Sequence, residues 1–305
     1  MSALELIVLG TASAVPTRKR NHNGYFVRWG AQGYLFDPGE GTQQQMSRAG
    51  LSAHNLTQVC ITHFHGDHCL GLPGVIQRIA RDGVPHPVDV AYPAAGEEYF
   101  QRLRWASDFQ PTDSITARPL EGPSPAPFGD PPITALPLRH SIPVYGYRIE
   151  EPVKTHMRAD ALAAKGVAGP SVGELKAKGT LVTSTGEVLA LADYSYRERG
   201  RSFAIVMDTG VCAGAAALAK GVDMLLIEAT YLSSESALAA KYLHLTARQA
   251  ARIAAEAGVR KLVLTHFSER YTAQGFERFA AEAAEEFSGD IVIANDLDRI
   301  GFPAR

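Results

Sequence analysis

The sequence has few cysteines and no long apolar run, and each shortage excludes a class of protein. Its three cysteines, Cys60, Cys69 and Cys212, are scattered over 305 residues, so neither a disulfide framework nor a Cys-x-x-Cys metal site is indicated. Such usage is typical of a reducing compartment, and we expect a cytoplasmic protein. No apolar run approaches the roughly 18 residues that cross a bilayer. The first ten residues lack the basic start and apolar core of a secretory signal, so no membrane association is expected.

The sequence also lacks an excess of charge of either sign. The formal net charge is −2, so the protein as a whole does not attract a polyanion, although a local basic patch could. With 46% hydrophobic and 20% charged residues, the composition is that of an ordinary globular protein. One local patch is the basic stretch 17–21, which is either a solvated turn or a loop that contacts phosphate.

The most informative stretch is residues 62–74, which follows the apolar end of a predicted strand at 58–61. It carries four metal-binding side chains within six positions, His63, His65, Asp67 and His68. Imidazole nitrogens and carboxylate oxygens are ligands that Zn²⁺ or Mn²⁺ uses. The alternative is a polar surface loop in which histidines happen to cluster. We favour a metal site, because the loop lies at the end of a strand, where α/β proteins place their chemistry.

Three more candidate ligands follow apolar strands elsewhere in the chain. His140 follows the predicted strand 133–138, Asp208 follows 202–207 and His266 follows 261–264. A lone histidine at a strand end is more often structural, but strand ends gather at one edge of a sheet, so these residues can converge on the histidine loop. Seven ligands suit two ions about 3.5–4 Å apart that share a bridging carboxylate and a water. Asp208 is the natural bridge, and the chemistry predicted is hydrolysis at an electrophile with anionic oxygens.

The rest of the pattern predicts mixed strands first, then an insertion, then β-α-β units. Residues 37–43 form a Gly-rich turn, a weak candidate for a phosphate cradle, and Thr42 could cap the helix that follows. The other predicted strands are 4–9, 25–29, 33–37, 88–92, 144–150, 223–227 and 290–294. The predicted helices are 44–49, 72–81, 94–104, 213–219, 247–257 and 275–287.

The insertion, residues 151–200, has few apolar clusters and a local excess of positive charge. Within residues 154–178 two acidic residues are outnumbered by five basic ones, Lys154, Arg158, Lys165, Lys176 and Lys178. Gly169 and Pro170 lie at its centre. The segment is either a solvated insertion or a basic arm that grips a phosphate backbone.

Residues 62–68 resemble the signature of the metallo-β-lactamase superfamily, and finer matches resemble its ribonuclease Z branch. The resemblance extends from residue 4 to about residue 271. The finer matches are residues 9–17, 36–43, 145–149, 169–170, 228–230 and 264–271.

The resemblance implies a four-layer αββα sandwich. It also implies a single domain, 1–305, with residues 151–200 as an inserted flexible arm. Two zinc ions are implied, although manganese would also suit the ligands. By analogy His63, His65 and His140 hold one ion, Asp67, His68 and His266 hold the other, and Asp208 bridges them.

The resemblance further implies the removal of 3′ trailers from tRNA precursors after the discriminator nucleotide, leaving a 3′-OH. Asp67 would act as general base, and His244, oriented by Glu228, as proton donor. The arm would bind the tRNA elbow of a partner subunit's substrate in a homodimer. Its candidate contact residues are Lys154, Arg158, Lys165, Gly169, Pro170, Lys176 and Lys178.

Three positions depart from the family pattern, Leu245 after the proton donor, Pro38 in the Gly-rich turn and Met207 before the bridging aspartate. Leu245 matters most, because it could alter the surroundings of His244. Two other functions stay open: a zinc hydrolase of small phosphodiesters or sulfate esters, for which the arm is dispensable, and a non-catalytic RNA-binding scaffold.

Overall fold

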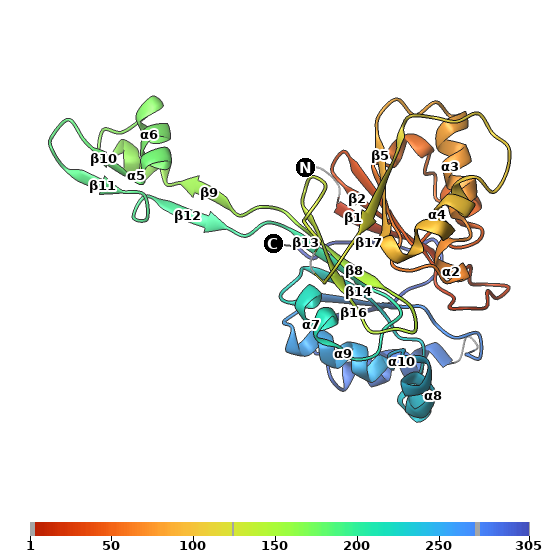
Figure 1. The fold of residues 1–305 in the computed structure, drawn as a ribbon. Coiled ribbons are helices and arrows are strands. Elements are labelled where there is room, and N and C mark those ends of the chain that lie inside the picture. The colour runs from red at the N-terminus through yellow and green to blue at the C-terminus, as the bar shows by residue number, and fades with distance from the viewer. Residues whose placement is uncertain (1–3, 124, 272–274, 305) are drawn as a thin grey trace. The chain divides into compact units, whose positions relative to one another are not determined.

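The computed structural model describes residues 4–123, 125–271 and 275–304, which form two compact units (Figure 1). The larger unit comprises Met1–Ile149 and Ser202–Arg305, and the smaller comprises Glu150–Arg201. Among the described helices, none has both the length and the apolar character that crossing a membrane requires.

The larger unit contains a seven-stranded sheet in the order β17-β1-β2-β3-β4-β5-β6. Its strands from β17 to β3 are antiparallel, and those from β3 to β6 are parallel. The bounds are β1 (Leu4–Gly10), β2 (Gly24–Trp29), β3 (Gln32–Phe36), β4 (Gln58–Cys60), β5 (Val88–Pro93), β6 (Ile115–Leu120) and β17 (Arg299–Gly301).

A six-stranded sheet follows the order β16-β15-β14-β13-β8-β7. The four strands from β13 to β16 are parallel, whereas β7 and β8 form an antiparallel pair. The bounds are β7 (Ile133–Pro137), β8 (Tyr145–Glu150), β13 (Ser202–Val206), β14 (Met224–Glu228), β15 (Lys261–Thr265) and β16 (Asp290–Ile293).

The two sheets pack face to face around a shared apolar core. Phe36 of the first sheet lies 5.9 Å from Tyr147 and 6.0 Å from Phe203 of the second, between ring centroids. In β1, Leu6 belongs to this core, whereas its neighbour Ile7 belongs to the cluster on the opposite face. Both faces of the strand are therefore buried, which is why its sequence is apolar throughout.

Helices cover the outer face of each sheet, which completes four layers. One set packs on the first sheet and another on the second, and each forms its own apolar cluster with the strands below. The first set is α1 (Thr42–Arg48), α3 (Leu72–Arg81) and α4 (Glu97–Arg104), and the second is α7 (Ala213–Ala219), α9 (Ala247–Glu256) and α10 (Phe276–Ala284). The predicted α/β fold class, an αββα sandwich, is confirmed.

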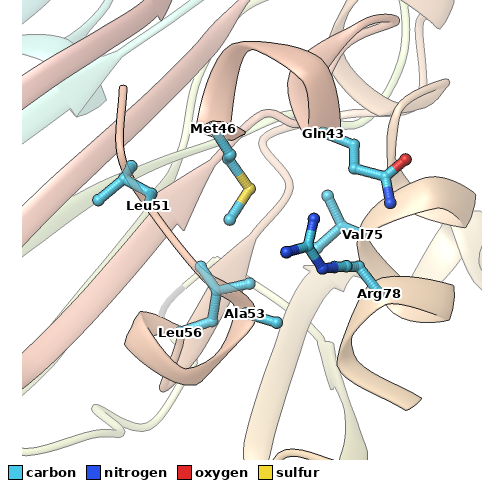
Figure 2. Close-up of a pocket in the computed structure, with 7 residues that line it drawn as sticks. All are labelled: Gln43, Met46, Leu51, Ala53, Leu56, Val75 and Arg78. Carbon is cyan, nitrogen blue, oxygen red and sulfur yellow. The ribbon is translucent and has the colours of Figure 1, made fainter. Parts of the chain in front are cut away.

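A small hollow lies between α1, α3 and the short turn η1 (Ala53–Asn55) (Figure 2). Met46, Leu51, Leu56 and Val75 line it, and its volume is about 10 Å³. That is room for no more than one water molecule, so the hollow is a feature of packing.

Several local predictions need correction. Thr42 does not cap α1: the cap is Gly41, with φ 84°, and the Thr42 hydroxyl donates to the Gly39 carbonyl instead. The sequence pattern did not predict the separate short helix α2 (Gly66–Cys69), which carries His68 and precedes α3. The sequence pattern also missed β6, β17, η3 (Ser233–Glu235) and α8 (Ser236–Tyr242).

The smaller unit is an ordered α/β structure with its own apolar cluster. Leu162, Val167, Leu175 and Leu189 are buried in it. Its strands pair as two antiparallel ribbons, β9 with β12 and β10 with β11. The elements are β9 (Lys154–Met157), α5 (Ala159–Ala163), α6 (Pro170–Lys178), β10 (Thr180–Val182), β11 (Val188–Ala190) and β12 (Ser195–Glu198). The sequence pattern indicated none of these elements.

Candidate metal centre and active site

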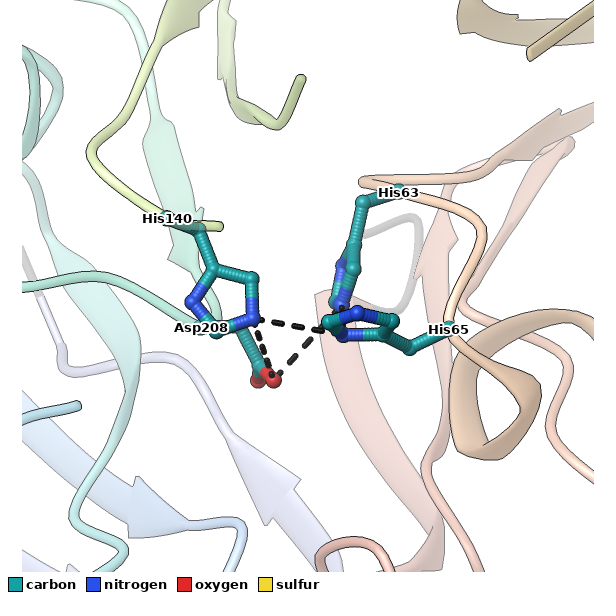
Figure 3. Close-up of side chains that lie close together, drawn as sticks. All are labelled: His63, His65, His140 and Asp208. Carbon is teal, nitrogen blue, oxygen red and sulfur yellow. Dashed lines mark hydrogen bonds and ion pairs between the residues drawn. The ribbon is translucent and has the colours of Figure 1, made fainter. Parts of the chain in front are cut away.

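The carboxyl ends of strands bring the candidate ligands together. His63 follows β4, His140 follows β7, Asp208 follows β13 and His266 follows β15 directly. Three imidazoles and Asp208 form one group of donor atoms that lie within 4.8 Å of one another (Figure 3). A second group of donors comes from Asp67, His68 and His266.

Within the first group the donor atoms face a common point. Nε2 of His63 lies 3.0 Å and Nε2 of His140 lies 3.2 Å from Nδ1 of His65. Oδ2 of Asp208 lies 3.6 Å from the His63 nitrogen and 3.8 Å from the His140 nitrogen. Donors held about 2.0–2.1 Å from a tetrahedral zinc ion stand about 3.3 Å apart. The four donors therefore have the spacing of such a tetrahedron.

The second group faces the other oxygen of the same aspartate. Oδ1 of Asp208 lies 3.2 Å from Nε2 of His68 and 3.0 Å from Nε2 of His266. Oδ2 of Asp67 lies 3.3 Å and 3.4 Å from the same two nitrogens. Asp208 thus presents one carboxylate oxygen to each group, which is the geometry of a bridging ligand.

Two buried atoms test whether a cation fits this donor set. Oδ1 of Asp208 and Nε2 of His266 have no hydrogen-bond partner among the described residues, although they lie 3.0 Å apart. Buried polar atoms without partners are rare and costly. A divalent cation between them would satisfy both, so the donor set fits a divalent metal site.

The second nitrogen of four of the imidazoles is held by a neighbour. Nδ1 of His63 faces the Thr62 hydroxyl at 3.0 Å, and Nδ1 of His140 faces the Leu243 carbonyl at 3.4 Å. Nδ1 of His68 faces Oδ2 of Asp37 at 2.8 Å, and Nδ1 of His266 faces the Thr230 hydroxyl at 2.7 Å. Such partners orient metal-binding histidines and fix which nitrogen carries the proton.

Protonation in the first group favours metal binding. Burial lowers the pKa of His63, His65 and His140, and neighbouring histidines lower it further. The neutral imidazole, which is the form that binds a metal, is therefore favoured.

The second group is dominated by negative charge. Burial opposes ionisation of Asp67, but the neighbouring His68 and His266 imidazoles bring its pKa far below the usual range. Burial likewise lowers the pKa of His68, yet the carboxylates of Asp208, Asp67 and Asp37 raise it well above its usual value. Three carboxylates around one buried ring call for a positive charge, which either a proton or a metal ion can provide.

The backbone at the site adopts unusual conformations. Five non-glycine residues in the described chain have positive φ, and four of them lie at this site: Asp37 (46°), Asp208 (40°), Leu243 (58°) and His266 (62°). Such residues cost free energy, and they cluster at functional sites, where the surrounding structure fixes them.

His244 and Glu228 form a hydrogen-bonded pair beside the donor atoms. Nδ1 of His244 lies 3.0 Å from Oε2 of Glu228, and its Nε2 lies 4.0 Å from Oδ2 of Asp208. Glu228 is fully buried and also accepts from the Thr209 backbone N–H and the Thr230 hydroxyl. Burial lowers the pKa of His244, but the carboxylates of Glu228 and Asp208 outweigh it and raise this pKa to about 9. The two carboxylates thus favour the protonated form of His244, whose Nε2 points at the metal site.

A pocket of about 570 Å³ opens over these groups. Both donor groups contribute to its floor, and its walls come from the first loop of the chain, from α8 and from the segment after His266. The residues outside the donor set that line it include Ser13, Val15, Tyr231, Lys241, Ser268 and Arg270.

The predicted arm residues are not part of this centre, because all seven belong to the smaller unit. Two of the five basic side chains among them are held in ion pairs. Lys165 pairs with Glu187 and Lys178 with Glu174, each at 2.7 Å.

The three departures from the family pattern do not remove a donor. The side chain of Leu245 is fully buried in the apolar cluster between the second sheet and its outer helices. A leucine there offers His244 no hydrogen-bonding group. Met207 lies in the core between the sheets. Pro38 supplies a carbonyl that accepts from the Gly71 N–H at 2.8 Å.

Sequence reasoning missed three residues that support the donors: Asp37, Thr230 and Asn23. Nδ2 of Asn23 lies 3.5 Å from Oδ2 of Asp67, and its Oδ1 accepts from the buried Tyr25 hydroxyl at 2.6 Å. Asp37 follows β3, so the rule that found the other ligands at strand ends could have found it. Thr230 and Asn23 carry no comparable signal.

The comparisons with known proteins agree with this geometry. The metallo-β-lactamase superfamily matches residues 17–157, and a β-lactamase superfamily domain matches residues 178–267. Ribonuclease Z of Thermobifida fusca is 62% identical over 100% of this chain and 96% of its own length. The chain belongs to the ribonuclease Z family. It is therefore a metal-dependent endoribonuclease, a hydrolase of phosphodiesters. The predicted family is confirmed.

Further relatives support the assignment. Ribonuclease Z of Nocardia farcinica is 54% identical over the full length of both chains. Human tRNase Z, short form, is 25% identical with a TM-score of 0.68, covering 98% of this chain and 100% of its own. The metallo-β-lactamase fold protein YhfI of Bacillus subtilis is 19% identical with a TM-score of 0.71, covering 98% and 99%, and supports the fold alone.

Proposed function

We propose that the chain is a zinc-dependent endoribonuclease that removes 3′ trailers from tRNA precursors. It cuts after the discriminator nucleotide and leaves a 3′-OH on the tRNA and a 5′-phosphate on the trailer. The observation that carries the proposal is the position of Asp208, which presents one oxygen to each of two donor groups. The relatives named ribonuclease Z supply the substrate class.

The metals we propose are two zinc ions per chain. His63, His65 and His140 would hold one, Asp67, His68 and His266 the other, with Asp208 between them. Five nitrogen donors favour zinc, although manganese is also compatible with such ligands. When bound, two cations lower the pKa of a shared water and stabilise the negative charge that develops on the phosphate.

Asp67 is the proposed general base. Its carboxylate is kept ionised by His68 and His266, and it borders the pocket above the donors. An ionised carboxylate at this position can accept a hydrogen bond from the attacking water and orient it toward the phosphorus.

His244 is the proposed proton donor to the leaving 3′ oxygen. Its Nδ1–H donates to Glu228, which leaves Nε2–H free to point into the pocket. Glu228 keeps the ring protonated and oriented, as the raised pKa of His244 indicates.

We further propose that the smaller unit binds the tRNA elbow and that the chain acts as a homodimer in the cytoplasm. The contact residues proposed for the arm are Lys154, Arg158, Lys165, Gly169, Pro170, Lys176 and Lys178. Of the five cations among them, Lys154, Arg158 and Lys176 form no ion pair among the described residues, which leaves them available for phosphates.

The test is to incubate the zinc-loaded protein with a 3′-extended tRNA precursor and to map the cut to the nucleotide. We expect one cut after the discriminator nucleotide, and two zinc ions per chain by metal analysis. Asp67→Asn should retain the fold and lose cleavage by at least about 100-fold, the lower end of what a positioned acid or base contributes. Random or absent cleavage by the unaltered protein would refute the proposal, and full activity of Asp67→Asn would refute the assignment of the base.

A further inference from the structure

A second, smaller pocket begins where the metal centre ends. Its volume is about 240 Å³, and it shares His65 with the larger pocket above the donors. Apart from His65, the side chains that line it are apolar or aromatic: Phe64, Pro93, Ala95, Tyr99, Ile142 and Pro143. Neither the proposed metal binding nor the proposed acid–base chemistry uses it.

The pocket is built on a stack of rings. Phe100 and Tyr92 are stacked, with centroids 4.3 Å apart, and Phe64 packs edge-on against Tyr92 at 6.0 Å. The next ring, Tyr99, lies 5.9 Å from Phe64 with 31° between the planes, and 53% of it is exposed. Phe64 is seated because Gly96 has no side chain: a Cβ atom there would lie 2.0 Å from the Phe64 ring. An aromatic surface is thus fixed in position with its outermost face open.

His65 connects this surface to the reaction centre. Its Nδ1 faces the other donors, so the Nε2 edge of the ring is turned away from them. No hydrogen-bond partner of Nε2 is found within the described part of the chain. A ligand that occupies both pockets would pass the edge of His65, and its group in the second pocket would meet only apolar and aromatic side chains.

We infer that this pocket stacks one nucleobase next to the scissile phosphate, with Tyr99 as the determinant of affinity. The inference rests on the proposed function, because RNA bound with its phosphate at the metal centre must place its flanking bases within reach of His65. Stacking on aromatic side chains accepts any base, since every base has a π-face. The pocket is just below the size range of drug-like sites, which suits one base and no larger group.

The test combines a variant of the protein with a variant of the RNA. Tyr99→Leu should lower kcat/KM for the 3′-extended precursor by about 5- to 100-fold, the range that loss of one base–aromatic stack produces. Tyr99→Phe retains the ring and should stay near the unaltered value. The precursor is then made with an abasic nucleotide at each position that flanks the cut, one at a time. At one of these positions the abasic RNA should be cut equally well by the unaltered protein and by Tyr99→Leu, which identifies the stacked base.

Controls separate stacking from damage to the metal centre. Tyr99→Leu should retain the metal content of the unaltered protein. It should also hydrolyse a phosphodiester that carries no base, such as an abasic dinucleotide, at the unaltered rate. Trp105→Leu removes another exposed aromatic ring, outside the pocket, and should leave cleavage unchanged. If Tyr99→Leu cleaves the precursor as well as the unaltered protein, or loses the same factor on every abasic RNA, the inference is wrong while the proposed function stands. If the unaltered protein does not cleave the precursor, both fall.

Discussion

At the scale of single residues, two kinds of group meet at the centre: the donors of the first metal group, and one imidazole outside both donor groups that favours its protonated form. The first are Asp208 and the imidazoles whose pKa is lowered, His63, His65 and His140. The second is His244, whose pKa is raised to about 9 by nearby carboxylates in spite of its burial. An acid and a set of neutral ligands therefore exist side by side, because Glu228 lies within hydrogen-bond distance of His244.

This arrangement predicts an alkaline limit to activity. His244 must be protonated to donate, so kcat/KM should fall as the pH rises through its pKa. Bound cations lower that pKa by repulsion, so the fall should occur at or below about pH 9. Glu228→Gln removes the carboxylate that raises the pKa, and the falling limb should then move to lower pH by about 1–3 units. The measurement is the pH profile of kcat/KM for the precursor.

A matched control removes one negative charge elsewhere. Glu277→Gln changes an exposed residue of α10 and should leave the limb in place. A limb that stays fixed in Glu228→Gln would show that His244 does not donate the proton, or that Glu228 does not raise its pKa.

The sequence indicated the metal-binding residues better than the residues that hydrogen-bond to them and hold them in place. His63, His140, Asp208 and His266 follow apolar strands, and strand ends converge by topology, so position alone brought them together. Asn23 and Thr230 act through side-chain directions that only the folded chain reveals. The partnership of Glu228 with His244 followed from the family resemblance, and the hydrogen bond now gives it a physical basis.

At the scale of elements, the Gly-rich turn 37–43 supports the histidine loop. The backbone N–H of Gly39 donates to the Asn23 and Asp37 carbonyls, and that of Thr42 donates to the Gly39 carbonyl. A Cβ atom at Gly39 would lie 2.2 Å from the Asp67 carbonyl oxygen. The turn therefore packs directly beneath the loop that carries the ligands.

Gly71 and Gly74 test this packing as a pair. A Cβ atom at Gly71 would lie 2.0 Å from the Gly39 carbonyl oxygen, whereas one at Gly74 would meet only the flexible Gln43 side chain at 3.2 Å. Gly71→Ala should lower the free energy of unfolding by about 3 kcal/mol, the upper end of typical overpacking, and weaken zinc affinity. Gly74→Ala lies inside α3 and should raise that free energy by about 0.5–1 kcal/mol.

Chemical denaturation of the metal-free proteins and zinc titration would measure both effects. Equal behaviour of Gly71→Ala and Gly74→Ala would show that the turn and the loop move independently.

Element prediction succeeded where a periodic apolar face was long. α3, α9 and the buried strands β1, β13 and β15 agree with the prediction within a few residues. It failed for α2, which has four residues, and for the short strands of the smaller unit. Elements this short have little stability of their own and form through the contacts around them, which a local pattern does not contain.

At the scale of the whole molecule, the smaller unit is independent in its packing. Glu150–Arg201 buries its own apolar cluster, and the three clusters of the larger unit contain none of its residues. The backbone N–H of Glu151 donates to the Arg201 carbonyl at 2.9 Å, so the two ends of the insertion are adjacent and a short linker can join them. Deleting only residues 154–178 would remove β9 and leave its partner β12 unpaired.

Replacing residues 151–200 with two glycines is therefore the sharper test of the arm. The variant should hydrolyse bis(p-nitrophenyl) phosphate at the unaltered rate, because the metal centre lies wholly in the larger unit. Its kcat/KM for the tRNA precursor should fall, and so should the salt dependence of binding.

The insertion contains comparable numbers of basic and acidic residues, so any attraction to RNA must come from local contacts. Loss of Lys154, Arg158 and Lys176 should lower the slope of log affinity against log salt by about 0.9 per phosphate contact.

A triple variant with Lys154, Arg158 and Lys176 changed to Gln separates charge from shape. It should reproduce the change in slope while the smaller unit stays folded, because all three side chains lie outside its apolar cluster. Survival of precursor cleavage in both variants would assign recognition to the larger unit alone. Loss of bis(p-nitrophenyl) phosphate hydrolysis in the deletion would show instead that the smaller unit supports the metal centre itself. The two substrates together therefore distinguish an arm that binds RNA from one that completes the catalytic site.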